Sequence, residues 1–250
     1  MLEVHPLTGM GEIRPGDDLC DLLRQALERL PIKPDHGDIL AITQKIVSKA
    51  EDRYVDLATV EPDQEALELA RKTGKDARLV ELILREADVV LRAEPGLLIM
   101  RHRLGLVMAN AGIDQSNIGT GRGERVLLLP ESPDLAARKI HDALLAELGI
   151  PLPVIITDSF GRPWRNGVTG VAIGVSGMSA LVDRRGEVDR DGRTLAATQV
   201  AFADLIASAA MLVTGEGAES IPAVLVRGLK HHGAGTARDL IRPLAEDLFQ

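Results

Sequence analysis

The sequence predicts a mixed α/β protein, and three observations support this fold class. Apolar residues recur at helical spacing in capped segments such as residues 19–30. Short β-branched runs without polar alternation, such as residues 154–157, are typical of buried strands. Helix and strand patterns are intermixed along the chain, without a repeat or a low-complexity linker. A length of 250 residues allows one large domain or two closely packed ones.

The first third of the chain predicts a strand and then a run of helices. After a strand at residues 4–7, Asp17 or Asp18 caps a helix over residues 19–30, which prolines 31 and 34 end. Residues 38–42 form a strand. Two helices follow, at 63–73 with Gly74 as the stop and at 76–85.

The rest of the chain alternates between strands and helices. Ser132 caps a long helix that ends before Gly149. Glycines lie within the apolar run 168–175 and between it and the run 180–182, which indicates bulges or close backbone contact. The further expected strands are 89–92, 97–101, 104–109, 126–129, 154–157 and 223–226; the further expected helices are an Ala-rich, well-buried one at 196–213 and a last one at 237–248, which contains Pro243.

Composition excludes several function classes. The excess of 37 acidic over 29 basic residues gives a net charge of −8, the wrong sign for a general nucleic-acid surface, and 2% aromatic residues leave few stacking platforms. No apolar run reaches the roughly 20 residues that span a bilayer, and the N-terminus has no signal-peptide pattern. The single cysteine, Cys20, fits a buried core position. We therefore expect a cytoplasmic protein that binds neither nucleic acid nor membrane.

Two acidic segments, residues 104–117 and 153–167, follow apolar strand-like runs. They place Asp114 and Asp158 beside small hydroxyl or amide side chains. Oxygen-rich groups of this kind suit Mg²⁺, which typically takes one or two carboxylates and substrate phosphates. An Asx-type turn at a strand end is the alternative interpretation. The carboxyl ends of strands are the usual ligand position in α/β sheets, which favours the functional one.

Basic and glycine-rich segments suggest an anionic substrate. Arg162 and Arg165 suit a phosphate or carboxylate, and Lys45 and Lys49 stand four residues apart after a strand. The glycines of residues 214–219 would admit phosphates, while Glu216 and Glu219 could ligate metal. Solvated lysines and a plain turn are the alternatives. The Walker A order is absent, and we expect the glycine-rich run 119–123 to join two strands.

Taken in order, these segments resemble the coenzyme F420-0:L-glutamate ligase family (F420 γ-glutamyl ligases). The matching segments are residues 15–19, 46–51, 110–117, 156–162, 215–217 and 221–228. The resemblance implies a single ligase domain over residues 1–250 with two interleaved lobes, assembled as an intertwined homodimer. It also implies that this chain lacks the C-terminal nitroreductase-like domain of some bacterial relatives.

The resemblance implies an acid–amino-acid ligase, which uses GTP to add one or more γ-linked L-glutamates to coenzyme F420-0. An acyl phosphate would be the intermediate, and GDP and phosphate the products. The reaction would require a divalent metal, Mg²⁺ or Mn²⁺, and K⁺. We expect two divalent ions. The implied metal ligands are Asp114, Asp158, Ser159 and Glu216, and the implied catalytic residues are Asp114, Asp158 and Arg162. The implied GTP-binding residues are Met10, Gly11, Glu12, Ile13, Gln44, Lys45, Lys49, Asn117, Leu212, Val213, Thr214, Gly215, Glu216, Gly217, Ala218 and Glu219.

Two other functions fit the same residues. Arg162 and Arg165 would hold a substrate carboxylate or phosphodiester in the ligase, but the same Asp and Arg residues suit a metal-dependent phosphohydrolase. The glycine-rich loops also suit a non-catalytic nucleotide-binding module. The number of glutamates added, the nucleotide preference, the acceptor variant, an amine base and the lobe boundaries do not follow from the sequence.

Overall fold

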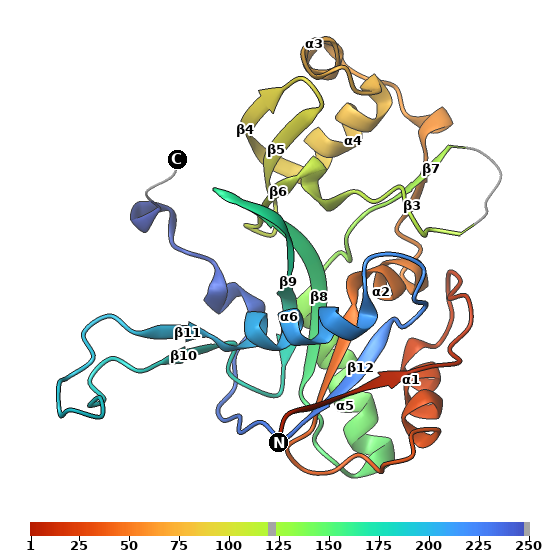
Figure 1. Ribbon diagram of the computed structural model, residues 1–250. Helices are drawn as coiled ribbons and strands as arrows, with labels where there is room; N and C mark the ends of the chain where they lie inside the picture. Colours follow the sequence, from red (N-terminus) through yellow and green to blue (C-terminus); the bar gives the residue numbers. More distant parts are fainter. Residues whose placement is uncertain (120–123, 248–250) are drawn as a thin grey trace.

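A five-stranded sheet forms the centre of the molecule. The computed structural model describes residues 1–119 and 124–247. Its central sheet has the order β1-β12-β2-β8-β9, in which β2 and β8 are parallel and all other neighbours antiparallel (Figure 1). The strands are β1 (Glu3–Leu7), β2 (Ile39–Thr43), β8 (Val154–Arg162), β9 (Arg165–Ser176) and β12 (Ala223–Arg227).

Helices cover both faces of this sheet, because its central strands are apolar on both sides. In β2, Leu40 and Ile42 join the core on one face, and Ile39 and Ala41 join the core on the other. The first core also contains apolar residues of α1 (Leu19–Glu28), α2 (Gln44–Ala50) and α5 (Pro133–Leu148). The second contains residues of α6 (Phe202–Thr214). Cys20 is half-buried and packs against the first core.

A separate hydrophobic cluster holds together the elements between α2 and α5 in sequence. It lies in the upper part of Figure 1. Its three-stranded antiparallel sheet has the order β4-β5-β6, and β3 pairs with β7 beside it. The elements of this group are β3 (Tyr54–Asp56), η1 (Leu57–Thr59), α3 (Gln64–Thr73), α4 (Ala77–Glu86), β4 (Ala87–Glu94), β5 (Leu97–His102), β6 (Val107–Ala109), η2 (Asn110–Gly112) and β7 (Arg125–Leu127).

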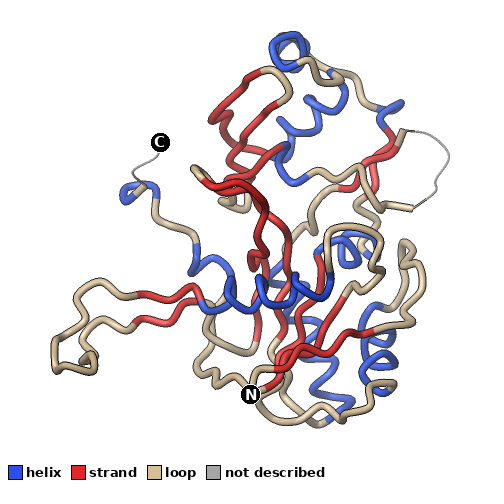
Figure 2. The backbone as a smooth tube through the Cα atoms, viewed as in Figure 1, coloured by secondary structure: helices blue, strands red, loops and turns tan. Residues whose placement is uncertain are grey.

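The β8–β9 hairpin links the two groups of elements. It rises from the central sheet toward β6, as the backbone trace in Figure 2 also shows. A Cβ atom at Gly170 would lie 2.4 Å from the carbonyl oxygen of Ala207, and one at Gly174 would lie 2.5 Å from the backbone of Pro133. Both glycines of β9 therefore allow close helix packing, which confirms the close backbone contact expected for this run.

The mixed α/β class is confirmed, but the helix predicted at 196–213 begins only at Phe202, and the helix predicted at 237–248 was wrong. Residues 199–201 form strand β11 (Gln199–Ala201) instead of the start of a helix, because they pair with β10 (Leu181–Asp183) in a ribbon that projects from the body (Figure 1). In place of the helix at 237–248, the described residues form two short 3₁₀ turns, η3 (Ala237–Leu240) and η4 (Leu244–Glu246). Pro243 lies between them, and proline disrupts a continuous helix.

Two further predictions involve short or undescribed segments. The strand expected at 104–109 covers only Val107–Ala109. The connection expected at 119–123 lies largely outside the described residues, since only Gly119 is described.

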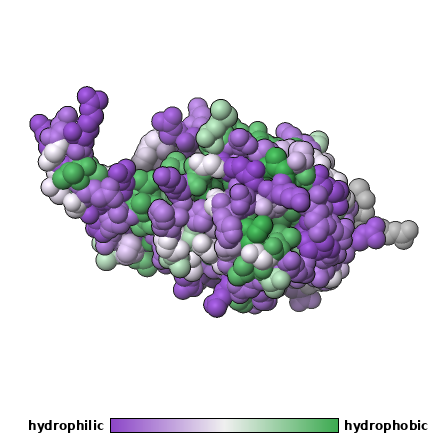
Figure 3. Space-filling model, turned by 90° about the horizontal axis from the view of Figure 1, so that it is seen from below, coloured by the Kyte–Doolittle hydropathy of each residue, from purple (hydrophilic) through white to green (hydrophobic). Residues whose placement is uncertain are grey.

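The surface is mixed in polarity. The face seen in Figure 3 is mainly hydrophilic and carries scattered hydrophobic patches, as is usual for folded proteins. Within residues 1–119 and 124–247, every helix is too short or too polar to cross a bilayer.

A half-buried carboxylate, Glu86, connects the end of α4 to neighbouring elements. Arg53 and Arg103 donate hydrogen bonds to Glu86 Oε2 at 3.0 and 3.2 Å. His102 Nδ1 accepts from the Leu104 backbone N–H, so its proton is on Nε2, which lies 3.5 Å from the same oxygen. Burial alone would raise the pKa of Glu86, but the interaction with His102 and the charges of Arg103 and Arg53 lower it to about 2.

We expect Glu86→Gln to lower the free energy of unfolding by about 2 kcal/mol, because two partly buried guanidiniums lose their counter-charge. The folded-state pKa lies below the ordinary value of 4.5, so ionised Glu86 stabilises the fold above that pH and the stabilisation is lost toward pH 2. Urea unfolding measures the free energy of unfolding across this pH range. Between pH 4.5 and pH 2 it should fall less steeply for the variant than for the wild type. Glu94→Gln, which affects only an exposed pair with Arg92, is the control and should change stability by less than about 0.5 kcal/mol. Equal losses in both variants would contradict this account.

Candidate active site

A cleft of about 740 Å³ opens where the carboxyl end of β2, the middle of β8, the segment before residue 120 and the loop after α6 meet. Its lining is rich in charged, hydroxyl and glycine residues. The lining residues are Gly11, Glu12, Ile13, Thr43, Gln44, Lys45, Ile46, Lys49, Asp114, Gln115, Ser116, Asn117, Ile118, Gly119, Thr157, Asp158, Ser159, Gly170, Ala207, Met211, Thr214, Gly215, Glu216, Gly217, Ala218, Ser220, Ile221 and Pro222.

The parallel register of β2 and β8 places the first two parts of the cleft side by side. Thr43, the last residue of β2, is paired with Thr157 of β8. One residue further, β2 gives way to helix α2, which carries Lys45, while β8 continues into Asp158. A lysine and an aspartate therefore meet at the carboxyl end of a parallel pair, where α/β sheets usually bind ligands.

Asp114 reaches the same cleft from the other group of elements. Its backbone exchanges two hydrogen bonds with Leu127, which aligns the segment with β7. The backbone N–H and the hydroxyl of Ser116 both donate to Asp114 Oδ1 at 2.9 Å. This is the Asx-type turn considered from the sequence. The other oxygen, Oδ2, lies 2.7 Å from Lys45 Nζ, so the turn presents the carboxylate to the cleft.

Asp158 carries the strongest electrostatic perturbation in the cleft. Burial raises its pKa to about 7; the Ser159 backbone N–H opposes the rise, the charge of Asp114 adds to it, Lys45 opposes it, and Glu216 adds to it. Ser159 Oγ donates to Glu216 Oε2 at 2.9 Å, which links β8 to the loop after α6. The local field around Asp158 therefore favours an additional positive charge.

The loop after α6 closes the cleft by contacts of its own. Asn117 Nδ2 donates to the Gly217 carbonyl oxygen at 2.9 Å, across a sequence separation of 100 residues. The Glu219 carboxylate folds back and accepts from the Gly217 N–H at 2.8 Å. A Cβ at Gly215, which has φ +67°, would lie 2.1 Å from Glu219 Cδ, so this turn requires glycine.

The remaining cleft cation is also paired. Lys49 is buried, and its Nζ lies 2.6 Å from Glu12 Oε1. Gln44 is buried at the start of α2 and accepts a hydrogen bond from Ser48 at 2.9 Å. Acidic side chains of the protein therefore neutralise both lysines.

Several residues expected at the site lie outside the cleft lining. Arg162 and Arg165 pair with each other at the exposed tip of the β8–β9 hairpin, because β8 runs on past Asp158 as a strand. Leu212 is 87% exposed, and it and Val213 belong to helix α6. Met10 is buried in the main core. Glu219 borders the loop without lining the cleft.

The structure also adds residues that the sequence interpretation missed. Thr157, Gly170, Ala207, Met211 and the segment 220–222 line the cleft. Gly170 and Ala207 line the cleft because α6 packs closely on β9; the sequence indicated the close contact at Gly170 but not its partner on α6. For Thr157, the only signal in the sequence was its position next to Asp158.

The donor set fits a divalent cation only with help from a substrate. Asp114, Asp158, Ser159 and Glu216 offer hard oxygen ligands around one cleft. Among the described residues, however, no three His, Cys, Asp or Glu side chains are grouped closely enough to hold a metal by themselves. Ligands such as phosphate oxygens would complete the coordination, as is common for Mg²⁺.

Glycine-rich backbone, paired lysines and carboxylates at the end of parallel strands define an enzyme cleft for a charged small molecule. Comparison with known proteins identifies the class. Residues 9–228 match the family model described as F420-0:Gamma-glutamyl ligase. The chain belongs to this family and is a ligase, and this membership places it in coenzyme F420 biosynthesis. The expected family and enzyme class are thus confirmed.

Three relatives are similar to this chain over nearly all of their length, and each is named coenzyme F420:L-glutamate ligase. The protein from Methanopyrus kandleri is 46% identical, covering 100% of this chain and 98% of the relative. Those from Methanocaldococcus jannaschii and Methanothermobacter thermautotrophicus are 44% and 42% identical, covering 91% and 97% of this chain and 90% and 96% of the relatives.

We expect Lys45→Met to tighten Mn²⁺ binding at least about tenfold, because the ammonium group both contacts Asp114 and repels an incoming cation. Isothermal titration with Mn²⁺ alone measures the affinity. The matched control is Lys49→Met, in the same helix; Lys49 contacts Glu12 instead of Asp114 and should change the affinity less. Weaker Mn²⁺ binding by Lys45→Met would contradict competition between the ammonium and the metal.

Proposed function

We propose that this ligase joins L-glutamate to coenzyme F420-0 at the expense of GTP. The relatives are named for coenzyme F420 and L-glutamate, and their similarity over nearly the full length supports these as the two molecules that are joined. The observation that carries the proposal is the convergence of Asp114, Asp158 and Glu216 with Lys45 on one cleft, from four separate parts of the sequence. A cleft with this charge pattern suits a nucleoside triphosphate and its metal.

The reaction requires activation of a carboxylate, because its leaving group in direct amide formation would be oxide. In the proposed first step, a carboxylate oxygen of F420-0 attacks the γ-phosphorus of GTP, and the bond to the bridging oxygen breaks to release GDP. In the second step, the α-amine of glutamate attacks the acyl carbon, phosphate leaves, and the amine nitrogen loses a proton. Positioning and charge neutralisation dominate catalysis of phosphoryl transfer.

The described residues can supply that positioning. Lys45 and Lys49 line the cleft, and each would exchange its carboxylate partner for a phosphate oxygen. Asn117 and the backbone of the loop around Gly217 line the same cleft and are hydrogen-bonded to each other. We propose that these residues border the nucleotide, together with residues 11–13.

Asp114, Asp158, Ser159 and Glu216 would hold the divalent metal, Mg²⁺ or Mn²⁺, as two ions. When bound, the metal supplies neutralisation of phosphate charge. The raised pKa of Asp158 and the ammonium at Asp114 both indicate a place suited to added positive charge, so the residues fit this role. We also propose that the reaction requires K⁺, as the family resemblance implies. Omitting K⁺ from the assay tests this requirement.

Arg162 and Arg165 would contact the part of the acceptor that extends beyond the cleft. Both lie at the exposed hairpin tip, where an anionic group of the acceptor, such as its phosphodiester, can reach them. We therefore assign both arginines to binding of the acceptor.

We expect amide formation only when GTP, Mg²⁺ or Mn²⁺, F420-0 and L-glutamate are all present. Mass spectrometry of the product, with each component omitted in turn, measures it and counts the glutamates added. GDP release without a glutamylated product would favour a metal-dependent phosphohydrolase, and GTP binding without any turnover would favour a nucleotide-binding module.

We expect Asp158→Asn to lower kcat about 100-fold or more, because the cleft loses a carboxylate placed against the phosphates. The assay is glutamylated product formed per unit time. Asp142→Asn, an exposed position on α5, is the matched control and should retain activity. Equal activity of the two variants would remove Asp158 from the mechanism.

We also propose the homodimer. Leu205 and Leu212 are 60% and 87% exposed on α6, near the projecting ribbon of β10 and β11, and thus provide apolar surface for a second copy. Light scattering coupled to gel filtration should give twice the chain mass of 26.8 kDa. The monomer mass at micromolar concentration would contradict the assembly.

A further inference from the structure

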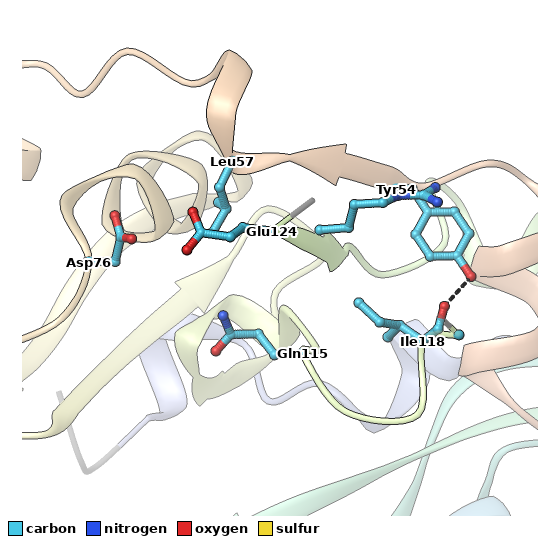
Figure 4. Close-up of a pocket in the computed structure, with 8 residues that line it drawn as sticks. Tyr54, Leu57, Asp76, Gln115, Ile118 and Glu124 are labelled. Carbon is cyan, nitrogen blue, oxygen red and sulfur yellow. Dashed lines mark hydrogen bonds between the residues drawn. The ribbon is translucent and has the colours of Figure 1, made fainter. Parts of the chain in front are cut away.

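A second cavity, of about 350 Å³, lies beside the cleft. The two share Gln115, Ile118 and Gly119 as lining residues. The rest of the second cavity is built by the β3–β7 pair and the start of α4. Figure 4 shows its wall, with Leu57, Asp76 and Glu124 facing Gln115 and Ile118 across the space.

An arginine is fixed in the wall of this cavity. The Tyr54 hydroxyl donates to the carbonyl oxygen of Ile118 at 2.6 Å, the dashed line in Figure 4, and this fixes the ring against the segment that carries Asp114. The Arg125 guanidinium lies over that ring, 3.9 Å from its centroid. Cation–π contact of this kind orients a guanidinium and leaves its N–H donors available.

The charge of Arg125 has no counter-ion among the described residues. The two carboxylates of the cavity, Asp76 and Glu124, are each 2.6 Å from Arg78 Nη2, which neutralises them from the other side. Arg125 itself makes no ion pair or side-chain hydrogen bond to residues 1–119 or 124–247. The sequence of the intervening residues 120–123, Thr-Gly-Arg-Gly, contains no carboxylate. A partly buried, oriented and unpaired guanidinium in a cavity wall is the arrangement of an anion site.

We infer that Arg125 binds a substrate carboxylate, so that this cavity is the glutamyl subsite of the ligase. The inference rests on the proposed function and names the residue that binds the glutamyl substrate. Leu127, two residues from Arg125, is hydrogen-bonded to Asp114, so the cavity lies against the strand that presents the proposed metal ligand. A glutamyl group held at Arg125 can extend past Gln115 and Gly119 into the cleft, where its amine or acyl group reacts. The carboxylate belongs either to incoming L-glutamate or to the glutamyl tail of an acceptor in a second addition.

Arg125→Gln tests this inference. We expect the KM for the glutamyl substrate to rise about 10- to 100-fold, as for loss of a charge-assisted pair, while the KM for GTP and the Mn²⁺ affinity stay within about twofold. Arg125→Lys keeps the charge without the planar fork and should fall between the two. The matched control, Arg92→Gln, removes an exposed arginine of β4 and should leave every constant unchanged. Thermal unfolding of each variant checks that the fold is intact.

The source of the carboxylate is read from the substrate whose constant moves. A rise in the KM for L-glutamate assigns the free amino acid; a rise confined to an acceptor that already carries one glutamate assigns the tail. L-Glutamine and L-isoglutamine, which lack the γ- and α-carboxylate, respectively, should be discriminated less by Arg125→Gln than by the wild type. A folded variant with unchanged KM values, or with a loss in kcat alone, overturns the inference.

A binding measurement separates this inference from the proposed function. Equilibrium dialysis with labelled L-glutamate, GTP, Mg²⁺ and a labelled monoglutamyl acceptor in separate arms requires no turnover. If wild-type protein binds neither glutamyl ligand, or binds one no better than Arg125→Gln, the subsite is wrong even where ligation occurs. If wild-type protein binds one through Arg125 but forms no amide, the proposed reaction fails and the subsite stands.

Discussion

The parallel pairing of β2 with β8 is the constraint on which the cleft depends. These two strands are apolar on both faces, so helices must cover both sides of the sheet, and the strand ends are the part left open. The register that pairs Thr43 with Thr157 brings α2 and Asp158 to the same edge. A shift of one residue in this register would turn the Asp158 side chain to the opposite face of the sheet. The hydrophobic pattern thus fixes the position of a polar group.

Charge balance is the second organising feature. The cleft contains lysines and carboxylates in near contact, and burial raises the pKa of the Asp158 carboxyl group to about 7. Such a site is suited to an exchange of partners. Substrate phosphates could replace the carboxylates as partners of the lysines, and the freed carboxylates could then bind metal. In the proposed function, this arrangement would let a chain with a net charge of −8 bind a strongly anionic substrate.

The second group of elements contributes more than a support for Asp114. Its β3–β7 pair carries Tyr54 and Arg125, and the Tyr54 hydroxyl is hydrogen-bonded to the same segment that leads from Asp114 to the second cavity. The cleft and the second cavity therefore share one wall. In the proposed reaction, this places the group that binds the glutamyl carboxylate and the group that faces the phosphates on a single stretch of backbone.

The sequence by itself determined the mixed α/β class, most helices and strands, and the chemical nature of the site, because capping residues, apolar periodicity and paired acidic segments are local signals. It also led to the family. Tertiary structure decided what depends on pairing partners. Residues 199–201 are a strand because β10 lies beside them, and β8 continues through Asp158 to Arg162 because β9 pairs with it. That extension carries the two arginines away from the cleft. The lack of a counter-ion for Arg125 among residues 1–119 and 124–247 is likewise invisible in the sequence, because it depends on Arg78 neutralising the two nearby carboxylates.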